Sequence, residues 1–151
     1  MAKTVTRREL LAGFVAAGAL FLPAAALADS LVLVVGPDSK LDDISHAKLR
    51  RVFLMRPTDS PNGGRFKPLN LPKGTHPRQT FDSKVLQMSP DEVNRYWIDQ
   101  KIRGVQPPPT VDAGAAVEIL KKVPAAIAYL PGSAATGLRK VSIEGNPHWL
   151  G

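Results

Sequence analysis

The sequence predicts an α/β fold in which a small mixed sheet is flanked by helices. Short apolar runs rich in β-branched residues alternate along the chain with segments whose apolar residues recur every three or four positions. The first pattern is typical of buried strands and the second of amphipathic helices. Strands that alternate with helices indicate the α/β class, and no internal repeat is visible.

The first predicted elements are a strand and a helix. Residues 31–35, Leu-Val-Leu-Val-Val, end at Gly36-Pro37 and predict a buried strand. Ser45 is placed to cap a helix that carries Leu49 on its apolar face. We expect this helix to end near Met55, shortly before a proline.

The next pair of elements is again a strand and a helix. A turn-rich loop over residues 58–65 leads to a second strand predicted over residues 66–71. Pro68 indicates an edge position or a bend, because proline cannot donate a hydrogen bond to a neighbouring strand. Pro77 fits the first turn of the following helix, where a missing N–H costs little. That helix carries three apolar residues inward: Phe81, Val85 and Leu86.

A further helix is marked by its first residues. Ser89 is the cap, Pro90 takes the first helical position and Glu92 completes a capping box. Gly104 is expected to end this helix. Its apolar face, which we expect in the core, consists of Val93, Tyr96 and Trp97.

The last third of the chain contains a connector, a helix and two strands. Residues 105–111 include three consecutive prolines and predict a stiff extended connector. Asp112 is placed to cap the helix. Residues 125–130 predict a buried strand, and residues 138–143 alternate in the manner of a final strand.

Residues 1–28 have the three parts of a cleavable export signal. A basic start is followed by an apolar run over residues 12–22 and by the small-residue ending Ala26-Leu27-Ala28. The run is too short for a permanent membrane helix, which needs about 20 such residues. Cleavage is therefore expected after Ala28, giving a periplasmic protein with no stable membrane anchor. The pair Arg7-Arg8 indicates a twin-arginine signal, with an ordinary secretory leader as the alternative.

The mature chain, residues 29–151, is expected to form one domain. Removing 28 of the 151 residues leaves 123, which is enough to bury a core. The absence of cysteine excludes disulfides, thiol chemistry and cysteine-bound metal. The signal carries a net charge of +2, so the formal net charge falls from +7 to +5 and favours anionic partners. The basic residues are scattered, so a nucleic-acid surface is not indicated.

The stretch LPKGTHPRQTF, residues 71–81, is the candidate ligand site. A helix that starts here offers free N–H groups and partial positive charge to a small oxyanion. Gly74 lets the backbone approach the ligand, and Lys73 adds a point charge. Arg78 offers two N–H groups to oxygens such as those of phosphate. The predicted oxyanion site is Lys73, Gly74, Thr75, His76 and Arg78.

A purely structural interpretation of the same stretch stays open. Pro77 has no N–H and removes one donor from the site. The side chain of Thr75 or His76 could cap the helix, with Gln79 as the partner in a capping box.

The remaining polar residues do not indicate catalysis, a metal or a cofactor. The three histidines, His46, His76 and His148, lack metal-ligand spacing. No serine lies in a G-x-S-x-G motif. Acidic pairs such as Asp91-Glu92 stand at expected helix starts, where the helix dipole favours them. We therefore expect a protein that is not an enzyme.

Four segments, in this order, resemble one lobe of the phosphate-type periplasmic substrate-binding proteins of ABC transporters. LVLVVGPDS resembles the strand that enters this lobe, and SHAKLRRVFL resembles a helix with the family pattern L-x-x-I-F. FKPLNLPKGTHPRQTFDSKVL is similar to a strand, anion-binding turn and helix in which S-G-T-R-x-x-F is usual. VPAAIAYLPG is similar to a P-G-A-I-G-Y strand.

The chain departs from the family at the site itself. Lys73 replaces the usual serine, and His76-Pro77 displace the arginine by two residues. The resemblance implies a single-lobe periplasmic protein that binds a small oxyanion such as phosphate and works with an ABC transporter or another periplasmic protein. The alternative is a protein-interaction module that kept the scaffold and lost the ligand.

Overall fold

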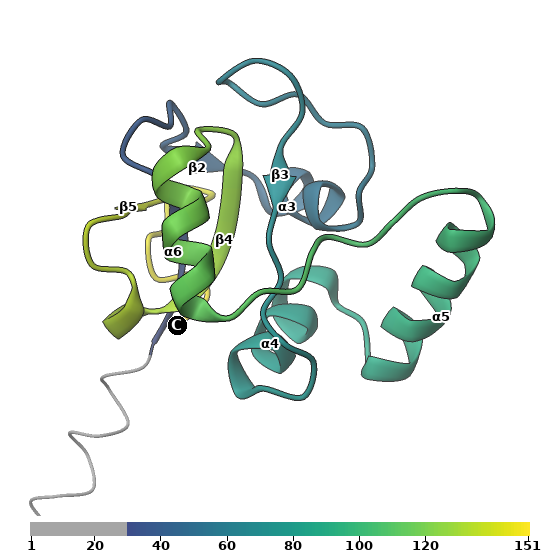
Figure 1. The fold of residues 1–151 in the computed structure, drawn as a ribbon. Helices are drawn as coiled ribbons and strands as arrows, with labels where there is room; N and C mark the ends of the chain where they lie inside the picture. The colour runs from purple at the N-terminus through teal and green to yellow at the C-terminus, as the bar shows by residue number, and fades with distance from the viewer. Residues whose placement is uncertain (1–29) are drawn as a thin grey trace, which may run out of the picture.

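The computed structural model describes residues 30–151, so the predicted export signal lies outside the described residues. A four-stranded mixed sheet has the order β3-β4-β1-β5 (Figure 1). Its two central strands, β1 (Leu31–Val35) and β4 (Ala126–Pro131), are antiparallel. At the edges, β5 (Arg139–Lys140) runs antiparallel to β1, and β3 (Lys67–Pro68) runs parallel to β4. The small mixed sheet confirms the predicted α/β class.

The central strands are buried because helices pack against the sheet. All five residues of β1 are buried. In β4, the ring of Tyr129 stacks on Phe81 of α4 (His76–Phe81) with 3.9 Å between centroids. The same ring lies 5.8 Å from Phe53 of α3 (His46–Phe53). These three aromatic side chains anchor α3 and α4 to the sheet.

Helix α6 (Ala113–Lys122) lies across β4 (Figure 1). Its last turn approaches the end of β1 so closely that only glycine fits at position 36. A Cβ atom on Gly36 would lie 1.8 Å from the carbonyl oxygen of Leu120. Asp112 caps α6 as predicted, because its Oδ1 accepts a 2.7 Å hydrogen bond from the amide of Ala115.

Two predicted strands are shorter than expected. Of residues 66–71, only Lys67–Pro68 form β3, which is an edge strand as Pro68 indicated. Beyond it the chain leaves β4, and Asn70 pairs instead with the proline-rich connector through the carbonyl of Pro109. The predicted final strand divides into β5 and β6 (Ser142–Ile143). These strands belong to different sheets, since β6 pairs in parallel with β2 (Asp43–Ile44).

The capped helices follow the sequence. Ser45 accepts from the amide of Lys48 at the start of α3. Ser89 and Glu92 form both bonds of the predicted capping box at the start of α5 (Pro90–Ile102). The helix α4 continues directly into a π-helical segment, η1 (Asp82–Leu86), which the sequence did not indicate. Gln87 ends this segment with a left-handed φ of 56°.

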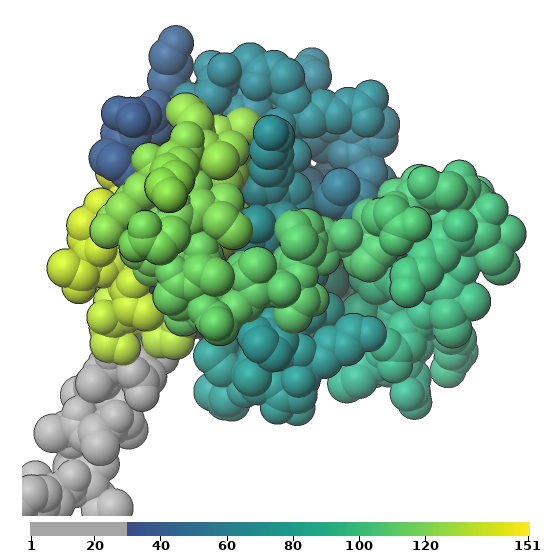
Figure 2. Space-filling model, viewed as in Figure 1, coloured from purple at the N-terminus to yellow at the C-terminus, as the bar shows by residue number. Residues whose placement is uncertain are grey.

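Helix α5 protrudes at one side of the molecule (Figures 1 and 2). Val93 and Trp97 are buried, which confirms the predicted face, and Tyr96 is half-buried. The hydroxyl of Tyr96 donates to the carbonyl of Leu54 at 2.8 Å, which ties the helix to the end of α3. No helix within residues 30–151 is long and apolar enough to cross a membrane.

The C-terminal segment packs back onto the domain. The ring of Trp149 lies 4.9 Å from that of His46 at the start of α3. Leu150 is buried, and its carbonyl accepts a 3.1 Å hydrogen bond from Lys84 of η1. The C-terminal segment therefore packs against α3 and η1.

A candidate anion-binding cleft

The turn between β3 and α4 needs glycine at one position. Gly74 has φ of +84°, in the left-handed region that side chains disfavour. A Cβ atom there would meet nothing within 4 Å, so the requirement comes from the backbone and not from crowding. The Thr75 hydroxyl donates to the carbonyl of Pro72 at 2.7 Å. Thr75 therefore stabilises the turn from within.

Arg78 is held by the protein itself. Its side chain is buried, and the whole residue is only 3% exposed. Nε donates to Oδ2 of Asp82 at 2.9 Å, and Nη1 donates to the carbonyl of Leu71 at 2.9 Å. Within residues 30–151, no partner is found for Nη2. One nitrogen of the guanidinium is therefore left for a ligand.

Asp82 lies beside Arg78 and balances its charge. Burial raises the pKa of Asp82 above the ordinary 3.8, and the charge of Arg78 acts in the opposite direction without cancelling that rise. The second carboxylate oxygen, Oδ1, is buried and has no hydrogen-bond partner among the described residues. The pair Arg78–Asp82 thus contributes little net charge to its surroundings.

Lys73 supplies positive charge that no carboxylate pairs with. Its ammonium donates to the amide oxygen of Asn94 in α5 at 3.1 Å, and this partner is neutral. An ammonium has three N–H groups, so two remain for other acceptors. Lys73 is exposed, and none of the ion pairs found within residues 30–151 includes it.

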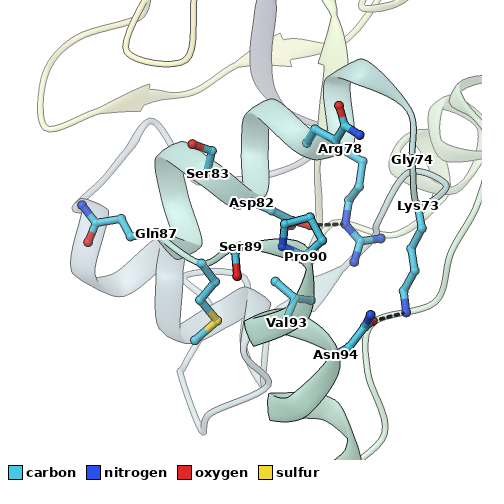
Figure 3. Close-up of a pocket in the computed structure, with 12 residues that line it drawn as sticks. Lys73, Gly74, Arg78, Asp82, Ser83, Gln87, Ser89, Pro90, Val93 and Asn94 are labelled. Atoms are coloured by element: carbon cyan, nitrogen blue, oxygen red, sulfur yellow. Dashed lines mark hydrogen bonds and ion pairs between the residues drawn. The ribbon is translucent and has the colours of Figure 1, made fainter.

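These side chains surround a cleft of about 780 Å³ between the α4–η1 helix and the start of α5. Figure 3 shows Lys73 and Arg78 extending from the turn toward α5, with Val93 and Pro90 among the side chains around the same space. The volume lies in the range of small-molecule sites, about 300–1,000 Å³. The polar lining is Lys73, Arg78, Gln79, Asp82, Ser83, Gln87, Ser89 and Asn94, with Gly74 at the turn and Met88, Pro90 and Val93 as the apolar part.

The predicted site residues do not all face this cleft. Lys73, Gly74 and Arg78 line it, whereas His76 lines a smaller hollow of about 320 Å³ together with Lys84. Thr75 takes the N-cap position of α4, but its side chain makes no capping bond. Capping by the side chain of Thr75 or His76 is therefore wrong. Among residues 30–151, the amides of Gly74, His76 and Arg78 have no partner.

Three residues of the cleft lining, Asp82, Asn94 and Val93, were not predicted from the sequence. Asp82 stands four residues after Arg78, a spacing at which side chains meet on a helix, so this pair could have been found. Asn94 and Val93 belong to a separate helix, and no local pattern links them to Lys73. Residues 30–151 contain no group of three histidine or acidic side chains that could hold a metal ion.

Comparison with solved structures shows where this fold occurs. No protein-family model matches the chain, and no curated protein does. The fold is similar to that of an ABC-type phosphate transport receptor from Vibrio cholerae, with a TM-score of 0.65 and 14% identity over 81% of this chain and 53% of that one. It is also similar to PstS from Borrelia burgdorferi, with a TM-score of 0.58 and 14% identity over 78% and 48% of the two chains.

A third similar structure contains a ligand. It is a phosphate ABC transporter substrate-binding protein with bound phosphate from Clostridium perfringens, with a TM-score of 0.62 and 13% identity over 80% of this chain and 47% of that one. At these identities the likeness shows the fold alone. The present chain spans about half the length of the proteins that it matches.

Proposed function

We propose that this chain is an exported, non-enzymatic binding protein that takes a small oxyanion, such as phosphate, in the cleft beside α4. Lys73, Gly74 and Arg78 form the cleft side of the proposed site. Thr75 holds the turn through its bond to Pro72, and His76 follows it as the first residue of α4. The proteins of similar fold are described as phosphate receptors or phosphate-binding components of ABC transporters, which supports this ligand class and such a transporter as a partner.

One observation carries the proposal: two cationic side chains and Gly74 of the turn line one cleft that holds a single carboxylate. The ammonium of Lys73 and Nη2 of Arg78 have donors to spare, and the only carboxylate of the lining, Asp82, is already paired with Arg78. The cleft is open to water, where a charge pair contributes roughly 0–1 kcal/mol. Binding is therefore expected to be weak, with a Kd on the order of 1 mM.

Calorimetry of the exported protein with inorganic phosphate, sulfate and acetate at low ionic strength tests the proposal. Saturable binding that Lys73→Gln weakens several-fold supports it. Lys101→Gln is the matched control, because this lysine is exposed near the end of α5 and does not line the cleft. Equal binding by both variants, or no saturable heat with any anion, would overturn it.

A protein-interaction module is the second candidate, and a different observation favours it. Ile98 and Ile102 on α5 are 63% and 81% exposed. They lie one helical turn apart, so they form an exposed apolar pair on the helix surface. Two of the three guanidinium nitrogens of Arg78 are also already bonded within the protein. Specific co-purification of one protein, lost on Ile98→Lys and Ile102→Lys, together with no anion binding, would favour this function.

We also propose that residues 1–28 are an export signal cleaved after Ala28, which leaves residues 29–151 as one periplasmic domain. The basic start, the apolar run and the small-residue ending support this. The intact mass of protein recovered from the periplasm should correspond to a chain that begins at Asp29. Replacing Arg7 and Arg8 by lysine should block export if the twin-arginine route is used, and should have little effect on an ordinary secretory leader.

A further inference from the structure

We propose that the oxyanion group bound in the cleft is the head of a larger amphiphilic organic anion, with one negative charge attached to an apolar body. This inference rests on the proposed anion site and adds the class of ligand that fills the rest of the space. It follows from three properties of the cleft: its size, its charge and its apolar wall.

The cleft is too large for an inorganic oxyanion alone. A five-atom ion such as phosphate occupies roughly two or three water volumes, about 60–90 Å³, on the scale of about 30 Å³ for one water. The cleft measures about 780 Å³. An ion bound beside Lys73 and Arg78 would leave most of this space to solvent. Volumes of this size accommodate an organic molecule.

The charge of the lining matches a single negative charge. Lys73 and Arg78 are the two cations of the lining, and Asp82 is its one anion. Asp82 accepts from Nε of Arg78, so these two side chains largely neutralise each other. Lys73 remains, with a neutral partner in Asn94. A carboxylate or a singly ionised phosphate ester would balance it.

The cleft has an apolar part, although most of its lining residues are polar. Met88, Pro90 and Val93 line it at the start of α5, and Val93 is fixed because it is buried in the core. Met88 is half-buried and unbranched, so its side chain can adapt to ligands of different shape. Figure 3 shows Pro90 and Val93 with the Arg78 guanidinium nearby in the same space. A charged head on the Lys73 side would thus place an attached chain against apolar side chains.

A homologous series of ligands tests this inference. Acetate, butanoate and hexanoate present the same carboxylate with increasing apolar length, and inorganic phosphate and hexyl phosphate provide the corresponding comparison for a phosphate head. Full burial strengthens binding about fourfold for each methylene, so Kd should fall two- to fourfold for each methylene added. Hexanol is the uncharged control and should bind at least tenfold more weakly than hexanoate.

Two variants separate the parts of the site. Lys73→Gln should weaken every anion of the carboxylate series by a similar factor and leave the dependence on chain length unchanged. Met88→Gln should reduce that dependence and leave acetate binding unchanged, since acetate does not reach the apolar wall. Unfolding midpoints of both variants, measured alongside, show that each is folded.

The outcomes distinguish failure of this inference from failure of the proposed function. Saturable binding of inorganic phosphate with equal Kd for acetate and hexanoate would overturn the amphiphilic ligand and leave the oxyanion site standing. Absence of binding by every anion would overturn both. Hexanol binding as tightly as hexanoate would show that charge plays no part, which also overturns the inference.

Discussion

Tyr129 connects the sheet to the turn that carries the candidate site. Its buried hydroxyl accepts the amide hydrogen of Leu71 at 3.1 Å and donates to Oδ1 of Asn70 at 2.9 Å. The carbonyl of Leu71 in turn accepts from Arg78. Burial raises the pKa of the Tyr129 phenol far above 10, so the hydroxyl remains protonated and keeps both bonds.

Tyr129→Phe should therefore destabilise the protein by about 1–3 kcal/mol, because it leaves two buried polar groups without a partner. Urea unfolding measures the loss. Tyr96→Phe is the matched control: it removes one hydroxyl bond, to Leu54, from a half-buried side chain and should cost about 0.5–1.5 kcal/mol. A smaller loss for Tyr129→Phe than for Tyr96→Phe would contradict the role of this network.

Asp82 is expected to stabilise the folded protein most at low pH, which is the reverse of the effect of a carboxylate whose pKa is lowered by folding. Its pKa is raised in the folded protein, chiefly by burial, so the folded state holds this proton more tightly than the unfolded chain. The resulting stabilisation is fully present below the unfolded pKa of 3.8 and is lost as pH rises through the raised pKa. The stability advantage of the wild type over Asp82→Asn should shrink as pH rises above about 4.

Asp43 provides a control of opposite sign for that experiment. The Ser142 hydroxyl and the amide of Gly145 bond to its carboxylate and lower its pKa below 3.8. The contribution of Asp43 is present above the unfolded pKa and is lost as pH falls through the lowered one. Unfolding free energies of wild type, Asp82→Asn and Asp43→Asn across an acidic pH series should show opposite trends for the two variants, and parallel curves would be contrary to this expectation.

At the scale of elements, α5 depends on its first turn because it protrudes from the molecule (Figure 2). The hydroxyl of Ser89 accepts from the amide of Glu92, and the Glu92 carboxylate accepts from the amide of Ser89. Ser89→Ala removes the first of these bonds and should cost about 0.5–2 kcal/mol. Hydrogen exchange should show faster exchange at the start of α5, with the amides of β1 and β4 protected as in wild type.

Asp112→Ala is the matched comparison for this cap, since Asp112 caps α6 through a single bond to Ala115. Its effect should appear at the start of α6, which lies across the sheet, and not in α5 (Figure 1). If amide hydrogens exchanged faster throughout the molecule in the Ser89→Ala variant, the effect of losing this cap would not be confined to α5, contrary to the prediction.

Helices were easier to predict than strands for a local reason. Ser45, Ser89 and Asp112 cap their helices through neighbours three residues along the chain, so the sequence contains the whole signal. The length of β3 is instead decided by distant residues, because Asn70 leaves β4 to pair with the segment at Pro109. The division between β5 and β6 likewise depends on distant strands, because β5 pairs with β1 and β6 pairs with β2 near the start of the domain.

The two walls of the cleft differ in the same way: one is formed by residues close together in the sequence, and the other depends on long-range packing. Lys73, Gly74 and Arg78 come from one continuous stretch of the sequence, and all three line the cleft. The other wall belongs to α5, and its placement depends on the burial of Val93 and Trp97 in the core. The hydrophobic effect is non-directional. The pattern of apolar residues therefore predicts that α5 packs on the core, but it does not predict that α5 lies opposite the turn that contains Lys73.

At the scale of the whole molecule, the two tryptophans report on different segments that share one core. Trp97 fixes α5, and Trp149 packs on His46 next to the buried Leu150. Both tryptophans belong to or pack against the same cluster of buried apolar residues. A domain of this size with one continuous core is expected to unfold in a single cooperative transition.

Two variants that each keep one tryptophan test this cooperativity. In Trp149→Phe, fluorescence follows α5; in Trp97→Phe, it follows the C-terminal segment. Within each variant the urea transition seen by fluorescence should coincide with that seen by far-ultraviolet circular dichroism, which follows all helices together. Comparing probes within one variant removes the effect of the substitution on stability. If Trp97 fluorescence changes at a lower urea concentration than the dichroism, α5 separates before the sheet unfolds, and the cleft would then open without loss of the remaining fold.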